Sequence, residues 1–369
     1  ATVLENATII RAFRARQWPG DASVVVSLLW LATGKWQGEL ILEGSPVAGI
    51  AADLRASFGD EPAELRHSLF AFEGVHNARG LAFVVPAGHP LCLHSSLVKP
   101  YVSGEDLTQT DPSTPARYVL DLTGWTEEQL ASLSTDVHRF LTDVVRPTRT
   151  EEDLRSYKGL AKRWWTFWNT REDGFKVVRR HDDCIVVPAV AKYLFALRLP
   201  SKWVYTNKVI VFDAQRPDVQ TLLLSPCFDV WSRKYGGTLG EGRVMKIASV
   251  VRTFPLPDRQ ADDSCAREWQ SAAIGALGRF GPGTNDVLNR LHDPACEDDD
   301  IWHLRQLCNQ IHESTIGAYG WHDLDTAFSF EQTDEGVRWG VPSEVRNELL
   351  QRLHQLNQHR AAASSPPAS

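Results

Sequence analysis

The fold is organised around a segment that begins with Lys162-Arg-Trp-Trp-Thr-Phe-Trp168 and ends with Arg252-Thr-Phe-Pro-Leu-Pro257. It mixes cations with flat aromatic rings and runs of β-branched residues. The wider segment from Arg146 to Gln260 holds 21 Lys/Arg and 12 Asp/Glu, a balance of +9 in a chain whose net charge is −7. The remaining residues, with 18 basic and 34 acidic side chains, therefore carry −16. A charge split of this size is typical of a surface that meets a polyanion, most often nucleic acid, although a solvated basic face explains it equally well.

The composition is that of an ordinary globular protein. With 369 residues, 43% of them hydrophobic and 23% charged, the chain is long enough for two or three domains. Its longest apolar run, Val24 to Ala32, has the length of a strand and is too short for a membrane span. Because the first residues also lack the pattern of a signal peptide, we expect a cytoplasmic protein without membrane contact.

The cysteines and histidines predict neither a disulfide framework nor a metal site. The six cysteines are irregularly spaced, and no Cys-x-x-Cys pair occurs. Cys308, His303 and His312 can share part of a helix surface, but their spacing matches no usual zinc cluster. The turn-like His181-Asp182-Asp183 lacks the further His and Asp of a metal hydrolase. We therefore predict no catalytic and no metal-binding residues.

Hydrophobic periodicity predicts strands in the first part of the chain and mixed structure in the middle. Thr8 to Arg16 and Ser23 to Leu31 read as a hairpin around Pro19-Gly20-Asp21, with the second strand buried. We expect helices at Thr126 to Val145 and at about Glu151 to Trp168. Further predicted elements are strands at Cys184–Val190, Lys202–Tyr205, Lys208–Phe212 and Val244–Val251 and a helix at Val219–Tyr235 despite Pro226.

After Pro257 the patterns become helical. They cover Ser264–Leu277, Thr284–Leu291, Ile301–Tyr319 and Ser343–His359. The small, Pro-containing residues 361–369 predict a disordered tail.

Several ordered motifs give the chain a resemblance to a known family. They are Phe13-Arg-Ala-Arg-Gln-Trp-Pro-Gly, Lys99-Pro-Tyr-Val-Ser-Gly-Glu-Asp-Leu with Arg117-Tyr-Val-Leu-Asp, Val145-Arg-Pro-Thr-Arg followed by Arg163-Trp-Trp-Thr-Phe, Phe254-Pro-Leu-Pro, and Ala318-Tyr-Gly-Trp-His-Asp-Leu. In this order they resemble the downstream half of the adenine-N6 DNA methyltransferases of type IIG and type IIL restriction–modification systems, the MmeI-like group.

The resemblance implies an α+β chain of three parts. Residues 1–97 look like the terminal strands of a methyltransferase-like sheet, residues 98–259 like an α+β target recognition domain, and residues 260–360 like a helical C-terminal segment. In this family a catalytic domain binds S-adenosylmethionine and flips out adenine, and the target recognition domain reads the sequence of double-stranded DNA.

One departure from the family pattern decides the expected activity. Methylation requires an Asn/Asp-Pro-Pro-Tyr/Phe motif, yet the only Pro-Pro here is Pro366-Pro367. No Gly-rich turn near the start could hold S-adenosylmethionine. The chain is therefore expected to be inactive alone and to act as the specificity part of a methyltransferase used in restriction–modification or phage defence. Its catalytic half, with the cofactor, lies on another chain or in a missing N-terminal half.

Nine basic residues of the middle segment are candidates for DNA contact. Those beside aromatic or strand positions are suited to phosphates, and those flanking the Gly-rich stretch from Gly236 to Gly242 could follow a loop into the major groove. Any of these arginines could instead be ion-paired, for example with Asp229 or Glu241. For Trp164, Trp165 and Trp168 we expect packing in the protein core and not stacking on DNA bases. The nine candidates are Lys162, Arg163, Lys192, Lys202, Lys208, Arg233, Lys234, Arg243 and Lys246.

Two other functions stay open from sequence. The chain could be a complete methyltransferase with a degenerate cofactor site. It could also be a structural subunit whose apolar strand from Ser23 to Leu31 docks on a catalytic chain, with DNA binding incidental.

Overall fold

The computed structural model describes residues 7–17, 25–47, 49, 50, 54, 61–78, 81–240, 242–333 and 335–364. These residues form two compact units. The first contains the described residues up to Ala63 together with those from His354 onward, and the second runs from Glu64 to Leu353. The predicted boundaries at 97 and 259 therefore both fall inside the second unit. Within the described ranges, no helix has the length and apolar character needed to cross a membrane.

The first unit is built on a four-stranded sheet in the order β2-β1-β3-β4. The predicted hairpin is confirmed, since β1 pairs antiparallel with β2, whereas its turn at Pro19-Gly20-Asp21 lies outside the described residues. Asn357 ties the end of the last helix to this unit, because its side-chain amide exchanges two 2.9 Å hydrogen bonds with the backbone of Ala63. The strands are β1 (Ala7–Gln17), β2 (Val25–Thr33), β3 (Leu40–Leu42) and β4 (Ser45–Val47).

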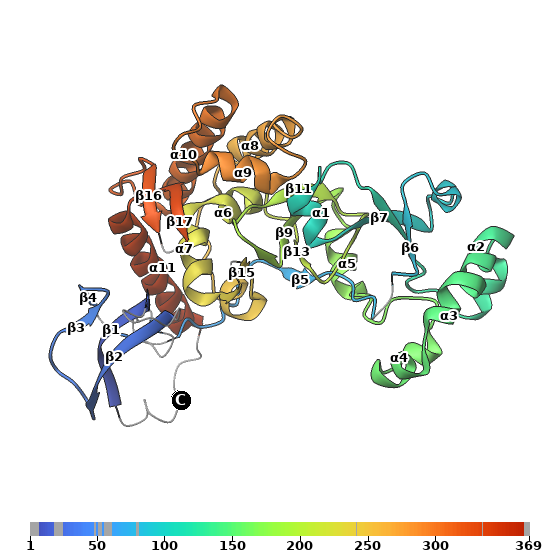
Figure 1. Cartoon of the computed structure of the whole chain (residues 1–369), viewed down its shortest axis with the longest axis horizontal. Coiled ribbons are helices and arrows are strands. Elements are labelled where there is room, and N and C mark those ends of the chain that lie inside the picture. Colours follow the sequence, from blue (N-terminus) through green and yellow to red (C-terminus); the bar gives the residue numbers. More distant parts are fainter. Residues whose placement is uncertain are drawn as a thin grey trace. The chain divides into compact units, whose positions relative to one another are not determined.

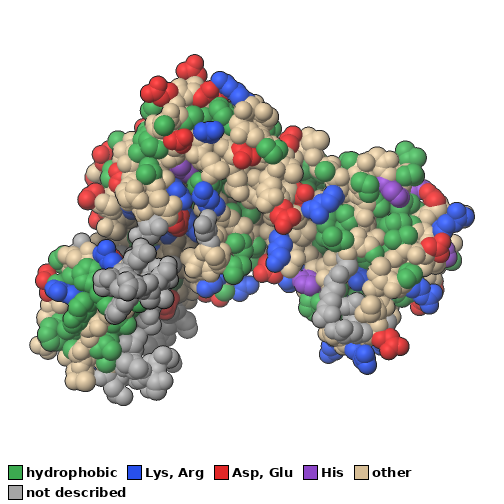
Figure 2. Space-filling model, viewed as in Figure 1, with side chains coloured by type: hydrophobic (Ala, Val, Ile, Leu, Met, Phe, Trp, Pro, Cys, Tyr) green, Lys and Arg blue, Asp and Glu red, His purple; other side chains and the backbone are tan. Residues whose placement is uncertain are grey.

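The prediction that the second strand of the hairpin is buried is wrong. β2 lies at the edge of its sheet, and its apolar side chains Leu28, Leu29, Trp30 and Leu31 are each 43 to 47% exposed. Neighbouring side chains of a strand point to opposite faces, so apolar groups are exposed on both faces of β2. Figure 2 shows hydrophobic side chains gathered on the surface of this unit.

The described residues of the second unit form four small sheets. Two have four strands, in the orders β11-β9-β13-β5 and β12-β7-β8-β6, and the others have the orders β10-β15-β14 and β16-β17. Their bounds are β5 (Ala71–Glu73), β6 (Val84–Pro86), β7 (Val98–Val102), β8 (Arg117–Leu120), β9 (Asp183–Pro188), β10 (Val190–Ala191), β11 (Leu197–Pro200), β12 (Val204–Tyr205), β13 (Val209–Phe212), β14 (Gly237–Leu239), β15 (Gly242–Val244), β16 (Ser329–Thr333) and β17 (Gly336–Gly340).

Strand β9 divides the core of this unit into two parts. Because successive side chains of a strand alternate between faces, Cys184 and Val186 enter one apolar cluster while Ile185 and Val187 enter another. The first cluster includes residues of α8, α9 and α10, and the second includes residues of α6 and α7. A strand buried on both faces explains why the sequence of β9 is apolar throughout and does not alternate.

The helices of the second unit are grouped as Figure 1 shows, with α8, α9 and α10 together and α2, α3 and α4 together elsewhere in the unit. The four helical patterns predicted after Pro257 are confirmed. The bounds are α1 (Gly104–Gln109), α2 (Thr135–Phe140), α3 (Arg146–Thr148), α4 (Glu151–Ser156), α5 (Glu172–Val178), α6 (Val219–Leu224), α7 (Pro226–Tyr235), α8 (Ser264–Gly275), α9 (Thr284–Leu291), α10 (Asp299–Tyr319) and α11 (Ser343–Ser364).

Two predicted helices are shorter than their apolar pattern indicated. The pattern from Thr126 to Val145 is broken at Leu133, whose backbone is extended, and helical structure resumes at Thr135 after Ser134. Serine favours the position before a helix, so it restarts the helix there. The helix expected from Glu151 to Trp168 ends at Ser156, and Gly159 then adopts a left-handed conformation with φ +85° that a continuing helix cannot accommodate.

The structure differs from the sequence prediction at three further places. The β-branched run predicted as a strand at Val244–Val251 becomes a strand only to Val244, then a π-type turn from Ile247 to Val251 that packs against Trp231. The β16–β17 hairpin interrupts the C-terminal segment that was expected to be helical. Of the predicted disordered tail, residues 361–364 are the last turn of α11, and the rest lies outside the described residues.

Candidate nucleic-acid interface

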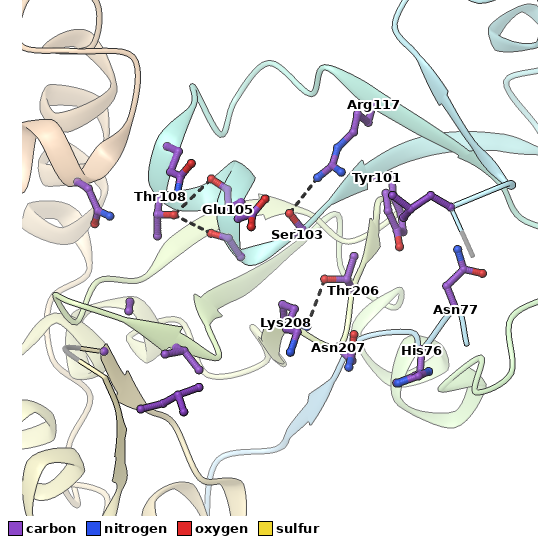
Figure 3. A pocket seen from close by; sticks show the side chains of 18 of the residues that line it. His76, Asn77, Tyr101, Ser103, Glu105, Thr108, Arg117, Thr206, Asn207 and Lys208 are labelled. Atoms are coloured by element: carbon purple, nitrogen blue, oxygen red, sulfur yellow. Dashed lines mark hydrogen bonds between the residues drawn. The ribbon is translucent and has the colours of Figure 1, made fainter. Parts of the chain in front are cut away.

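A groove of about 700 Å³ opens between three of the small sheets of the second unit. The end of β7, the start of α1, the turn between β12 and β13, and strands β10, β14 and β15 contribute to it, as Figure 3 shows in part. Its lining combines cations, side-chain amides and a few apolar groups. The lining residues include His76, Asn77, Leu81, Tyr101, Ser103, Gly104, Glu105, Gln109, Arg117, Val190, Lys192, Thr206, Asn207, Lys208, Leu239, Gly242 and Asn285.

A close approach of two backbones forms the floor of the groove. β7 pairs with β8 and with β12, and the chain turns at Ser103 into α1. A Cβ atom on Gly104 would lie 2.9 Å from the backbone oxygen of Lys208, so only glycine lets α1 pack this closely on the β12–β13 turn. Lys208 is also fixed within the β12–β13 turn, because its backbone N–H donates a hydrogen bond to the hydroxyl of Thr206 at 3.2 Å.

A hydrogen-bond network fixes the start of α1. The carboxylate of Asp106 accepts from the backbone N–H of Ser103 at 2.6 Å and from its hydroxyl at 2.7 Å. Arg117 donates to the same carboxylate and, at 2.9 Å, to the hydroxyl of Ser103. The charge of Arg117 is therefore matched by Asp106, and its guanidinium lies 5.9 Å from the ring of Tyr101.

Lys192 and Lys208 are the positively charged side chains of the groove that have no ion-pair partner among the described residues. Burial lowers the pKa of His76, and Arg171 and Lys208 lower it further, so this ring is neutral at neutral pH. Burial raises the pKa of Tyr101, which therefore keeps its proton. Lys192 donates to Asn289 at 3.1 Å, and Lys208 is exposed. The groove thus offers positive charge beside the amides of Asn207, Gln109 and Asn285.

Of the nine residues predicted to contact DNA, the groove brings together only Lys192 and Lys208. Lys162 and Arg163 are exposed at the end of a 3-10 turn (Leu160–Lys162), and Lys202 is exposed in the turn after β11. Lys246 is exposed just after β15, where its side chain packs against Gly237. Arg233 and Lys234 lie half-buried in the last turn of α7. Lys162, Lys202 and Lys246 have no ion-pair partner within the described part of the chain.

Arg243 belongs to a network of ion pairs. Ion pairing was the alternative to DNA contact that the sequence left open for this residue. It donates to Asp229 at 2.6 Å and to both oxygens of Glu335 at 2.7 and 3.0 Å, and its side chain is only 13% exposed. Arg233 pairs with the same two carboxylates at 2.8 and 3.0 Å. Burial alone would raise the pKa of Asp229, but the two arginines outweigh it and hold that pKa far below its usual range. Arg243 therefore anchors the base of the β14–β15 hairpin.

Folding neutralises much of the charge split seen in the sequence. Among the described residues, six arginines between 146 and 260 form ion pairs with carboxylates from outside that segment. Arginine suits such pairs because its planar fork donates several hydrogen bonds at once, whereas lysine is more strongly hydrated. The pairs are Arg171–Glu73, Arg179–Asp121, Arg198–Asp263, Arg233–Glu335, Arg243–Glu335 and Arg252–Glu64.

The tryptophan cluster divides between core and surface. Trp165 is buried and donates to the backbone oxygen of Trp125 at 3.1 Å, as packing predicts. Trp164 is half-buried beneath the guanidinium of Arg146. Trp168 lies edge-on to the ring of His76, which lines the groove, with ring centroids 5.0 Å apart.

No protein-family model matches this sequence, and no curated protein does. The fold does have a counterpart among solved structures. It is similar to the type IIL restriction–modification enzyme MmeI, whose structure was determined in complex with DNA, with a TM-score of 0.65 at 14% sequence identity. The match covers 98% of this chain and 47% of MmeI, so the chain spans about half the length of that enzyme. The predicted α+β class is confirmed, and the likeness to MmeI is one of fold.

The sequence predicted few of the residues that line the groove, although the motif that begins at Lys99 contributes to the lining. Lys99-Pro-Tyr-Val-Ser-Gly-Glu supplies Tyr101, Ser103, Gly104 and Glu105. The amides of Asn77 and Asn285 come from distant positions, and their approach depends on the fold. Among the described residues, no group of three His, Cys, Asp or Glu side chains is arranged to hold a metal ion. Burial raises the pKa of Cys184 and of Cys308 to about 12, so neither thiol is a nucleophile at neutral pH.

Proposed function

We propose that this chain recognises double-stranded DNA in a sequence-specific manner as the specificity part of an adenine-N6 DNA methyltransferase of a restriction–modification or phage-defence system. The observation that carries the proposal is the groove, which sets Lys192 and Lys208 beside several side-chain amides. Lysines supply salt-dependent affinity for phosphates, and Asn and Gln amides pair with base edges. The similarity of the fold to an enzyme that was solved with DNA supports the same function.

A partner that carries the methylation chemistry is part of the proposal. The chain has no Pro-Pro-Tyr or Pro-Pro-Phe sequence and corresponds to about half of MmeI. The exposed strand β2 supports a docking role, because a strand with apolar groups on both faces normally lies inside a sheet that is covered on both sides. We propose that a catalytic chain or N-terminal half, which binds S-adenosylmethionine, covers this strand.

The first experiment measures binding of the chain to a fluorescent duplex by anisotropy at several salt concentrations. Affinity should fall as salt rises, with a slope of log K on log salt of about −0.9 for each neutralised phosphate. Replacing Lys192 and Lys208 by Glu should weaken binding and make the slope shallower by about 0.9 per lysine. Lys202→Glu is the matched control, because Lys202 is equally exposed but does not line the groove.

Two results would contradict this assignment. Affinity that is independent of salt argues against phosphate contact, and equal losses in the Lys202 variant and the groove variants argue against the groove. Titration of the chain with S-adenosylmethionine by calorimetry tests the alternative of a complete methyltransferase. We expect no saturable heat from the chain alone, and adenine methylation only after a chain with an Asn/Asp-Pro-Pro-Tyr/Phe motif is added.

A further inference from the structure

The β14–β15 hairpin presents a single large apolar side chain beside the groove. Leu239 is the last residue of β14 and is 67% exposed. Two more exposed apolar side chains, Leu81 at 64% and Val190 at 36%, line the same groove. The rest of the lining is predominantly polar or charged. A ligand that meets this surface must therefore offer an apolar group next to polar and anionic ones.

The pairing of the hairpin fixes the direction of Leu239. Thr238 lies opposite Arg243, and Leu239 lies opposite Gly242. Because side chains alternate across a strand pair, Arg243 and Leu239 point to opposite faces of the hairpin. The Arg243 face is tied to Asp229 and Glu335 by the ion pairs described above. Leu239 therefore points to the face that lines the groove, and no side chain stands opposite it.

The hairpin packs closely on β10 next to an open tip. In the pair nearest the tip, a Cβ atom on Gly242 would lie 2.6 Å from Cγ1 of Val190, so β15 packs closely on β10 there. At the tip, Gly240 has φ +58°, and a Cβ atom there would have no neighbour within 4 Å. β15 also pairs with β10 at Arg243 and Val244, so only the last pair of the hairpin, Leu239 and Gly242, extends beyond the three-stranded part of the sheet. A two-stranded β-ribbon fits the major groove of B-DNA. The 5-methyl group of thymine is the apolar group among the donors and acceptors on the base edges there.

Resting on the proposed function, we propose that Leu239 determines specificity by contacting the 5-methyl group of a thymine in the major groove. Lys192 and Lys208 would hold the neighbouring phosphates while the hairpin tip enters the groove of the DNA. The contact removes one methyl group and part of the leucine from water, and burial of one such carbon group corresponds to about fourfold in affinity. Leu239 thereby favours thymine over every other base at one position of the site.

The test uses uracil, which differs from thymine only by the missing methyl group. Duplexes that the intact chain prefers are first selected from a random pool, and each thymine of the preferred site is then replaced singly by uracil. At one position the replacement should weaken binding about fourfold. Leu239→Ala should weaken binding to the thymine duplex by a similar factor and bind the thymine and uracil duplexes equally. Thr238→Ala, on the opposite face of the hairpin, should keep the discrimination.

Failure of this inference can be told apart from failure of the proposed function. If the chain selects a sequence but Leu239→Ala discriminates thymine from uracil as the unaltered chain does, the role of Leu239 is wrong and DNA recognition stands. If no uracil replacement affects the unaltered chain, the same conclusion holds. If the chain selects no sequence and binds no duplex, both proposals fail. Circular dichroism of the Leu239 variant checks that the fold is retained, which its exposure leads us to expect.

Discussion

Replacing Asp229 by Asn should destabilise the second unit in a manner that depends on pH. The carboxylate accepts from Arg233 at 2.8 Å and from Arg243 at 2.6 Å. Removing one partner from a fully buried ion pair costs about 3 to 5 kcal/mol. Asp229 is 28% exposed and Glu335 still faces both arginines, so we expect a smaller loss, about 2 to 3 kcal/mol at pH 7.

The pH dependence follows from the depressed pKa values of Asp229 and Glu335 in the folded chain. A carboxyl group of this kind stabilises the fold fully above its unfolded pKa of about 4 and loses that contribution as the pH falls toward the folded value. The difference between the unaltered chain and Asp229→Asn should therefore be largest at pH 7 and shrink below pH 4.

Urea unfolding followed by tryptophan fluorescence between pH 3 and pH 7 measures this difference, and far-ultraviolet circular dichroism provides an independent signal. Glu313→Gln is the control, because Glu313 is exposed on α10 and forms no ion pair within the described residues. A loss in the Asp229 variant below about 0.5 kcal/mol, the range of an ordinary surface change, would refute the reasoning. A loss of equal size at pH 3 and pH 7 would do so as well.

Three further changes test other parts of the fold. Gly74→Ala places a Cβ atom 2.0 Å from a backbone oxygen and should prevent stable folding, whereas Gly275→Ala, at an open helical position, should raise the free energy of unfolding by about 0.5 to 1 kcal/mol in urea titrations. Arg305→Met removes a fully buried guanidinium that donates to four backbone carbonyls and should cost about 3 kcal/mol or more, seen as a lower melting temperature. Burial lowers the pKa of His292 to about 3, so the unfolded chain takes up the extra proton first, and this residue should lower stability by up to about 1.4 kcal/mol per pH unit below pH 6.5; melting curves of His292→Asn should show a correspondingly shallower slope, because buried His312, with a pKa of about 4, still contributes.

Local sequence signals predicted the elements whose own residues determine them. The helix predicted at Thr284 to Leu291 begins and ends at those residues. The single helix predicted from Val219 to Tyr235 is instead divided into α6 and α7, because Pro226 occupies the first turn of a new helix. The alternation of β1 and the apolar run of β9 likewise reflect their own side chains. Val250 and Val251 contradict their strand preference because burial against Trp231 outweighs a preference of about 1 kcal/mol or less.

The candidate site was harder to predict because its properties depend on contacts between distant residues. Lys192 and Lys208 were proposed from their position beside strands, and the fold brings them to one groove. Arg243 was proposed because it flanks a Gly-rich stretch, yet Glu335 lies 92 residues away and occupies its guanidinium. A count of charges along a sequence cannot separate these cases, since the ion pairs that remove a charge from the surface form only in the folded chain.

The remote carboxylates that neutralise these arginines limit where the polypeptide can be recombined. A chimaera that imported only residues 146–260 from another protein would leave Glu64, Glu73, Asp121, Asp263 and Glu335 facing unfamiliar neighbours. Loss of a partner would be costly for the largely buried pair Arg198–Asp263, whereas an exposed pair such as Arg252–Glu64 contributes little. A new recognition sequence is therefore better installed by exchanging exposed groove residues one at a time, which leaves the supporting framework intact.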